Sequence, residues 1–238
     1  MKNKISLLLL IIFLVILTVI FIYLLIEQRN LILNLEKKEK KDNGNIEIKI
    51  TDKKIIEKTD SEEIEIIYPQ IELQDGFNEQ VEKKVKNILD EFKEYSSSDN
   101  IGPRPYVLNV KYEKGEISQD LVSIIFIIEN YTGGAHSNTF FSSINYDIKN
   151  NKLIYLKDFF PNNSNYLKTI SDFAIKDLTA QQEEKFGEAN SEWILDGAGP
   201  KEENFLSFLV NKNNITFYFP PYQVAFYAAG YFKVIMPR

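Results

Sequence analysis

The first feature of the chain is a long run of apolar residues that begins at Ile5 and ends at Ile26. Only three weakly polar residues interrupt it, and it contains no charge. A helix of this length rises about 33 Å, which matches the hydrocarbon core of a bilayer at about 30 Å. The pattern therefore predicts one transmembrane helix over residues 5–26, with residues 1–4 as a short cytoplasmic tail.

A cleaved signal peptide is the competing interpretation, because Lys2 and Lys4 precede the apolar run. The apolar part of a signal peptide usually spans about 7 to 15 residues and ends in small residues. This run is longer and continues into Glu27, so we expect an uncleaved signal anchor in the plasma membrane, with the C-terminal domain outside the cell. The lysines of residues 27–45 favour the opposite orientation, but acidic residues are interleaved with them, and the topology stays open.

Residues 27–45 have the composition of a charged juxtamembrane linker or helix, with Asn43-Gly44 as a stop signal. Beyond them, apolar and charged residues alternate over residues 46–50 and again over residues 64–68. This is the period of a half-buried strand. The pattern predicts that a β-hairpin opens an extracytoplasmic domain over residues 46–238.

Apolar residues recur at helical spacing in two later segments. One runs from Phe77 to Phe92 and the other from Leu167 to Leu178, each with charges on its opposite face. Further strands are predicted at residues 107–111 and 121–129, joined by a turn at Lys114-Gly115, and at residues 140–148, 152–156, 205–210, 215–219 and 231–236. Residues 183–201 are polar and contain no predicted element. The sequence therefore predicts an α+β fold with a mainly antiparallel sheet packed by two amphipathic helices.

The amino-acid composition excludes several classes of function. Hydrophobic residues make up 44% of the chain, which indicates a globular domain. Residues 71–238 contain 23 acidic and 17 basic side chains, which disfavours nucleic acid as a partner because phosphates need a cationic surface. The chain has no Cys and a single His, so thiol catalysis, disulfides and Cys/His zinc sites are excluded. We predict no cofactor and no metal.

The single histidine, His136, follows a Gly133-Gly134-Ala135 loop whose glycines allow unusual backbone torsions. Either it binds a ligand, or it ties a loop to the edge of the sheet. The densest aromatic run comes after Pro220-Pro221, and its rings either stack on sugars or pack in the core. The predicted ligand-binding residues are Tyr131, Gly133, Gly134, His136, Asn138, Tyr222 and Tyr227. No catalytic residue is predicted.

Three acidic residues, Asp196, Glu202 and Glu203, lie close together in the sequence. They are candidates for paired acid–base carboxylates or for a cation site. However, sequence neighbours point in different directions, and neither calcium-loop spacing nor a glycosidase pair is specified. We therefore interpret them as solvated charges.

Several segments together resemble an extracytoplasmic family of unknown function. They are YPQI at residues 68–71, TGGAHSN at 132–138, LKDFF at 156–160 and the closing stretch from Glu203 to Pro237. The same segments resemble the sensor ectodomain of the RsiV-type anti-sigma factor, which recognises lysozyme, and the non-catalytic region of PdaC-type peptidoglycan deacetylases. The resemblance implies a shared fold and a setting in the cell envelope. We expect neither output activity, since four residues precede the anchor and no hydrolase segment follows Arg238.

The sequence thus favours a non-enzymatic, membrane-tethered binding or sensor-like domain of the bacterial cell envelope. Its expected ligand is a lysozyme-like protein or the cell-wall glycan, peptidoglycan. One alternative is an envelope hydrolase or deacetylase-associated enzyme that uses the His136 loop. The other is a structural scaffold whose juxtamembrane helix pairs with another copy.

Overall fold

The computed structural model of the chain describes residues 22, 25–29, 48–97 and 105–238. The chain separates into two compact units, Met1–Glu47 and Ile48–Arg238. In the first unit Ile22 and residues 25–29 are helical. No helix within the described ranges has the length and apolar character needed to cross a bilayer. Apart from these few helical positions, the predicted tail, anchor and linker over residues 1–45 lie outside the described residues.

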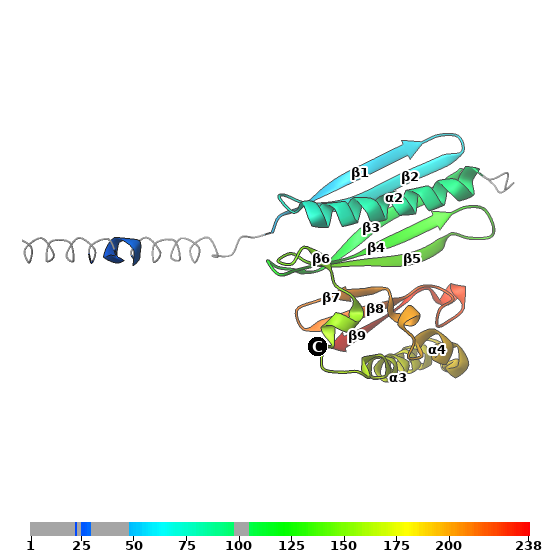
Figure 1. Cartoon of the computed structure of the whole chain (residues 1–238). Coiled ribbons are helices and arrows are strands. Elements are labelled where there is room, and N and C mark those ends of the chain that lie inside the picture. Colours follow the sequence, from blue (N-terminus) through cyan, green and yellow to red (C-terminus); the bar gives the residue numbers. More distant parts are fainter. Residues whose placement is uncertain (1–21, 23–24, 30–47, 98–104) are drawn as a thin grey trace, which may run out of the picture. The chain divides into compact units, whose positions relative to one another are not determined.

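The second unit contains a six-stranded sheet whose strands follow one another in chain order (Figure 1). The strands are β1 (Ile50–Lys58), β2 (Glu62–Ile71), β3 (Tyr106–Ile117), β4 (Leu121–Tyr131), β5 (Asn138–Asp147) and β6 (Lys152–Leu153). Every neighbouring pair is antiparallel except β2 and β3, which are parallel and are linked by the long helix α2 (Asp75–Ser97). A hairpin of β1 and β2 opens this unit as predicted, but its first strand was misplaced: β1 begins at Ile50, the last residue of the predicted segment, and runs to Lys58.

The turn predicted at Lys114-Gly115 is wrong. Both residues lie inside β3, and the chain turns after Ser118, whose N–H donates to the Leu121 carbonyl at 2.8 Å. The pairing of β3 with β4 shifts between Lys114 and Ile117, which marks a β-bulge. An added Cβ on Gly115 would come within 2.3 Å of the Val210 carbonyl oxygen. The glycine is therefore needed for the close approach of another strand rather than for a turn.

The C-terminal part forms a three-stranded antiparallel sheet and two helices. Its elements are η1 (Leu156–Phe159), α3 (Tyr166–Phe186), α4 (Ser191–Ala198), η2 (Glu202–Phe205), β7 (Phe208–Val210), β8 (Asn214–Phe219), η3 (Tyr227–Ala229) and β9 (Phe232–Pro237). The second predicted amphipathic helix is confirmed as α3. The polar segment 183–201 contains α4, which the sequence analysis missed; its cap Asn190 accepts the Trp193 N–H at 3.0 Å.

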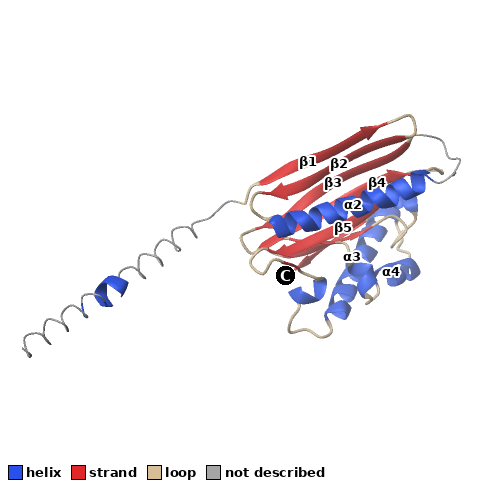
Figure 2. Cartoon of the chain, turned by 45° about the horizontal axis from the view of Figure 1, so that its top comes forward, coloured by secondary structure: helices blue, strands red, loops and turns tan. Residues whose placement is uncertain are grey.

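Side-chain alternation along β4 sets the layers of this unit. Ile124 and Phe126 pack with α2, whereas Ile125 faces Leu209 and Tyr218 of the smaller sheet. The opposite face of the smaller sheet packs against α3 and α4. The order is therefore α2, large sheet, small sheet, then α3 with α4. Figure 1 shows the small sheet between the large sheet and the two helices, and Figure 2 shows α2 lying along the face of the strands.

Two serine hydroxyls join the sheets along the free edge of β7. The Phe208 N–H donates to Ser143 Oγ at 2.7 Å, and the Val210 N–H donates to Ser123 Oγ at 2.8 Å. Ser123 is fully buried and its hydroxyl donates to Asn145 Oδ1 at 2.6 Å. The N–H groups that an edge strand leaves without a strand partner are thereby satisfied.

We predict that Ser123→Ala lowers the free energy of unfolding by about 1 to 3 kcal/mol, because the buried Val210 N–H and Asn145 lose their partner. Urea unfolding of the full chain in mild detergent measures this. Ser142→Ala, on the neighbouring strand, is the matched control, because the Ser142 hydroxyl has no hydrogen bond within the described ranges. Equal stability of the two variants would contradict a structural role for the Ser123 contact.

A second link between the sheets is polar. The Tyr218 hydroxyl donates to Glu113 Oε2 at 2.6 Å, and Lys233 Nζ donates to both oxygens of the same carboxylate at 3.1 and 3.2 Å. Lys233 also lies over the Tyr218 ring, 4.6 Å from its centroid. Burial, and then the hydrogen bond to Glu113, raises the pKa of Tyr218 well above its ordinary value of 10.0.

This pKa shift predicts a loss of stability in alkali. Above a pH of about 10 the unfolded chain releases the Tyr218 proton while the folded chain keeps it, so the free energy of unfolding falls as pH rises. In Tyr218→Phe this contribution disappears, so the free energy of unfolding falls less steeply as pH rises. Unfolding measured between neutral pH and about pH 11 tests it; identical pH dependences for the two proteins would refute the assignment.

Candidate functional site

The structure brings the predicted histidine loop and the predicted aromatic run together. The His136 ring stacks on Tyr227 with centroids 3.5 Å apart and planes inclined by 15°. The Tyr222 hydroxyl lies 3.4 Å from His136 Nε2. We call these three residues the histidine cluster. Its two tyrosines lie about 90 positions after the histidine in the sequence.

Hydrogen bonds and left-handed backbone hold the loop in place. Gly133 and Gly134 have φ values of 94° and 99°, which only glycine adopts readily. The Tyr131 hydroxyl donates to the Gly134 carbonyl at 3.2 Å, and the Tyr227 hydroxyl donates to the Ser137 carbonyl at 2.6 Å. The predicted residue Asn138 instead begins β5 and pairs with β4. The loop is thus fixed against the aromatic run, and Asn138 is not part of the cluster.

Tyr222 has an unusual backbone for a non-glycine residue, with φ at 72°. Such a conformation costs about 1 to 3 kcal/mol and persists only where neighbours impose it. The Trp193 Nε1–H donates to the Tyr222 carbonyl at 2.8 Å, and the Tyr222 N–H donates to the Ala225 carbonyl at 3.0 Å. This backbone presents the Tyr222 ring at the surface, 53% exposed, beside His136.

The contacts of His136 fix the tautomer of its ring. His136 Nδ1 lies 3.0 Å from the Ser137 carbonyl, so it carries the proton there, and Nε2 faces the Tyr222 hydroxyl. No carboxylate contacts His136 within the described ranges, so no acid orients the imidazole. The same part of the chain holds no group of three or more His, Asp and Glu residues that could bind a metal ion.

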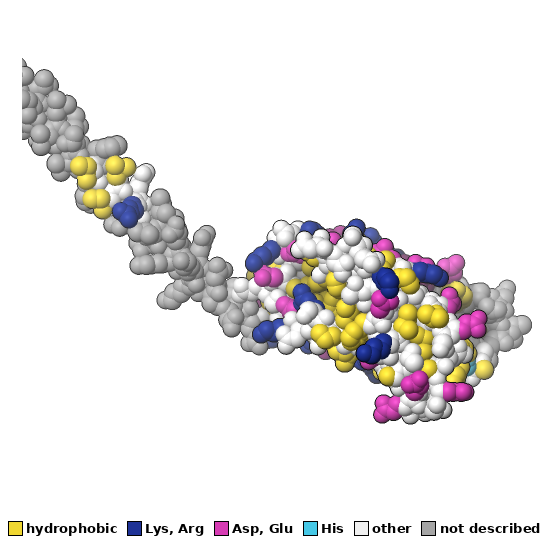
Figure 3. Space-filling view, turned by 90° about the horizontal axis from the view of Figure 1, so that it is seen from below, with side chains coloured by type: hydrophobic (Ala, Val, Ile, Leu, Met, Phe, Trp, Pro, Cys, Tyr) yellow, Lys and Arg dark blue, Asp and Glu magenta, His cyan; other side chains and the backbone are white. Residues whose placement is uncertain are grey.

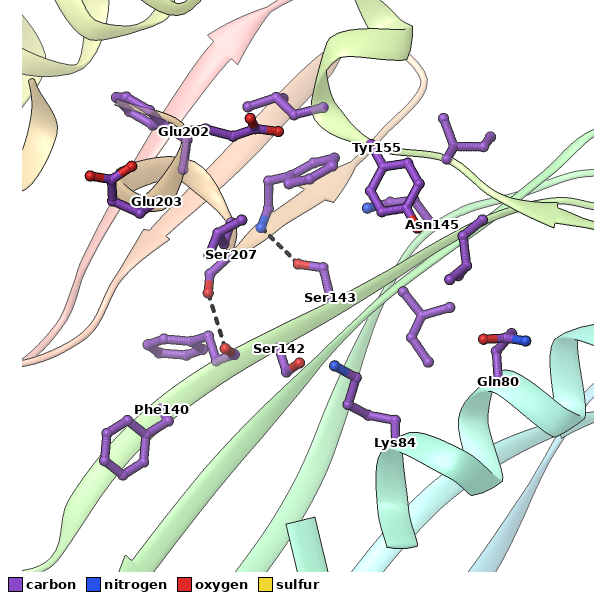
Figure 4. Close-up of a pocket in the computed structure, with 18 of the residues that line it drawn as sticks. Gln80, Lys84, Phe140, Ser142, Ser143, Asn145, Tyr155, Glu202, Glu203 and Ser207 are labelled. Atoms are coloured by element: carbon purple, nitrogen blue, oxygen red, sulfur yellow. Dashed lines mark hydrogen bonds between the residues drawn. The ribbon is translucent and has the colours of Figure 1, made fainter. Parts of the chain in front are cut away.

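A hollow that the sequence analysis missed lies beside β5 (Figure 4). Its volume is about 590 Å³, and residues of α2, β5, η2 and the segments around Tyr155 and Pro220 line it. We call it the β5 groove. Phe140 and Tyr155 present rings there that are 47% and 57% exposed. Pro220 and Gln223 of its lining flank Tyr222, so the groove and the histidine cluster share one loop.

The polar groups of the β5 groove divide into two sets. The hydroxyls of Ser143 and Ser207 are committed to the fold, since Ser143 accepts the Phe208 N–H and Ser207 donates to the Phe141 carbonyl at 3.0 Å. In contrast, the side chains of Gln80, Asn87, Ser142 and Lys84 have no hydrogen-bond partner in the part of the chain that the structure describes. These groups are free to bind a ligand.

The acidic residues singled out in the sequence separate. Asp196 lies at the surface, 3.8 Å from Lys201, as expected for a solvated charge. Glu202 and Glu203 are exposed at the η2 wall of the groove. On the face of the molecule in Figure 3, acidic and basic side chains are interspersed with apolar ones. The three carboxylates therefore do not form one site.

Two family models match consecutive parts of the chain. Residues 55–139 match the model described as Deacetylase PdaC, and residues 157–238 match the model described as Protein of unknown function (DUF3298). The chain is also 34% identical over 124 residues to the peptidoglycan-N-acetylmuramic acid deacetylase PdaC of Bacillus subtilis. That match covers 52% of this chain and 25% of the relative, so the chain spans about a quarter of the relative's length.

Solved structures of DUF3298 proteins have a similar fold. A family member from Bacteroides fragilis superposes with a TM-score of 0.50 at 16% identity, and one from Pseudomonas aeruginosa with 0.53 at 14%. Each comparison covers 80% of this chain and 90% of the other. The resemblance to the RsiV-type ectodomain stays a prediction. The chain thus joins a region like that of PdaC-type deacetylases to a region of the DUF3298 type, which confirms the family resemblance predicted from the sequence.

Proposed function

We propose that this chain is a non-enzymatic, cell-wall-associated binding domain whose β5 groove holds the glycan of peptidoglycan. The observation that carries the proposal is the pair of exposed rings, Phe140 and Tyr155, beside side chains without hydrogen-bond partners in the described ranges. The C–H face of a sugar packs on such a ring while its hydroxyls bond to the polar groups. The relative's name places peptidoglycan among the substrates of a similar protein.

The size and chemistry of the groove support binding rather than turnover. A volume of about 590 Å³ falls within the range of about 300 to 1,000 Å³ that is usual for small-ligand sites. The groove contains no histidine, and His136 has a carbonyl and a phenol as its neighbours rather than a carboxylate. The described residues therefore do not combine a histidine with an orienting carboxylate at this groove.

The proposal includes a tether. The charge-free run over residues 5–26 has the length of a bilayer-spanning helix, and it would hold the domain on the outer face of the plasma membrane. Residues 27–45 would then space the domain from the headgroups. This arrangement would put the β5 groove in the compartment where peptidoglycan lies.

Removing the two rings should weaken binding to the wall. We predict that Tyr155→Ala and Phe140→Ala each lower the affinity of the full chain for purified peptidoglycan sacculi about twofold to twelvefold, as expected when about 0.5 to 1.5 kcal/mol of ring contact is lost. Co-sedimentation in mild detergent measures it. Ile56→Ala is the control, because Ile56 is 68% exposed on β1 and does not line the groove.

Two outcomes would contradict this function. Retention of the wild-type chain by immobilised lysozyme and not by sacculi would favour a protein ligand. Release of product from sacculi that is lost in His136→Ala, with folding intact by circular dichroism, would favour the enzyme alternative. Unchanged sedimentation of His136→Ala is the result expected of a groove ligand.

The tether makes a separate prediction. Added protease should digest the domain on cells whose wall has been removed while their membrane stays intact, because the domain lies outside. A fluorescent reporter at Arg238 that stays protected until the membrane is broken would place the domain in the cytoplasm and overturn the topology.

Crosslinking of the chain with and without residues 27–44 tests the scaffold alternative. That alternative expects crosslinked pairs of the intact chain and their loss when residues 27–44 are removed.

A further inference from the structure

One cation in the β5 groove differs from its neighbours on α2. Lys86, on the same helix, is paired with Asp90, and Lys93 is paired with Glu57 at 2.5 Å. Lys84 is half-buried in the groove lining and has neither a salt bridge nor a hydrogen bond within the described ranges. Its ammonium is therefore partly desolvated, and no carboxylate of the described residues forms a salt bridge with it.

Physical chemistry gives such a group a strong preference for an anion. Burial lowers the pKa of Lys84, and the charge of Glu91 opposes this only in part. The ammonium has already lost part of its hydration in the unliganded fold, so an incoming carboxylate meets a smaller desolvation cost on the protein side. Charge-assisted hydrogen bonds between ammonium and carboxylate are about twice as strong as neutral ones.

The two walls of the groove carry opposite charges, which would orient a charged ligand. Lys84 lies on the α2 side, whereas Glu202 and Glu203 lie on the η2 side (Figure 4). The adjacent Lys83 of α2 also belongs to the lining. A negative group is attracted to the first wall and repelled by the second. A ligand with one carboxylate therefore has a single favourable orientation, with its uncharged part against the rings.

We propose that the β5 groove is specific for a carboxylate-bearing sugar and that Lys84 binds the carboxylate. This deepens the proposed function and rests on it. A muramyl residue offers this chemistry from two sources, the lactyl carboxylate of the unsubstituted sugar or the terminal carboxylate of an attached peptide. A neutral polymer of N-acetylglucosamine offers neither, and it should bind only through the rings and the uncharged polar groups.

Isothermal titration of the full chain in mild detergent tests the proposal with defined probes. They are a neutral N-acetylglucosamine oligomer, the disaccharide of N-acetylglucosamine and N-acetylmuramic acid, its lactyl amide, and the same disaccharide carrying a short peptide with a free or amidated end. We expect a free-acid form to bind about tenfold more tightly than its amide. The preference should shrink as salt is added.

Variants assign the preference to one residue. Lys84→Gln should bind acid and amide equally, and Lys84→Arg should keep a preference for the acid. Lys86→Gln is the matched control on the same helix and should behave as the wild type. A preference for the lactyl acid identifies the sugar carboxylate, and one confined to the peptide-bearing probes identifies the peptide carboxylate; both support the proposal.

Two results would overturn it in distinguishable ways. Equal binding of acids and amides by the wild type, or a preference that survives in Lys84→Gln, would remove the role of Lys84 while the groove remains a sugar site. Binding of no probe by the wild type would remove the proposed function as well. The acid–amide comparison in the wild type needs no variant, so it decides the matter even if Lys84→Gln fails to fold.

Discussion

The structure of residues 48–238 depends on how the unpaired edge of β7 is satisfied. An edge strand packed on the face of another sheet buries N–H groups that no strand can pair. Here the hydroxyls of Ser123 and Ser143 accept the N–H groups of Val210 and Phe208. An apolar side chain at either position would leave a buried donor without a partner, at a cost of about 1 to 3 kcal/mol. These contacts set where the small sheet sits on the large one.

Both candidate surfaces follow from that placement. The short helix η2 directly precedes β7, so fixing β7 over β4 and β5 brings Glu202 and Glu203 opposite α2 and forms the β5 groove. The loop after β8 then reaches the His136 loop, where Tyr222 and Tyr227 contact the imidazole. The strained backbone of Tyr222 is compatible with this view, because a packed frame can impose a conformation that an isolated loop would not keep.

The comparisons with known proteins divide the chain within the segment that lines the β5 groove. The PdaC-like match ends at residue 139 and the DUF3298 match begins at residue 157. The stretch between them carries Phe140, Ser142 and Tyr155, which line the groove together with residues from both matched regions. A site of this kind belongs to neither region alone, because it forms only where the two sheets meet.

The sequence by itself determined most of the elements of this protein, and the tertiary structure decided how they combine. Apolar periodicity predicted α2, α3 and most strands, because burial of one face leaves a local pattern. The same pattern does not show which strands pair, so it missed the parallel pairing of β2 with β3. It also misassigned Gly115 to a turn, whereas the glycine is needed because a strand of the C-terminal sheet approaches it closely. His136 and Tyr222 were each predicted from local composition, yet their contact, the β5 groove and the unpaired state of Lys84 arise between segments far apart in the chain. Packing of two sheets, which no short stretch encodes, brings those segments together.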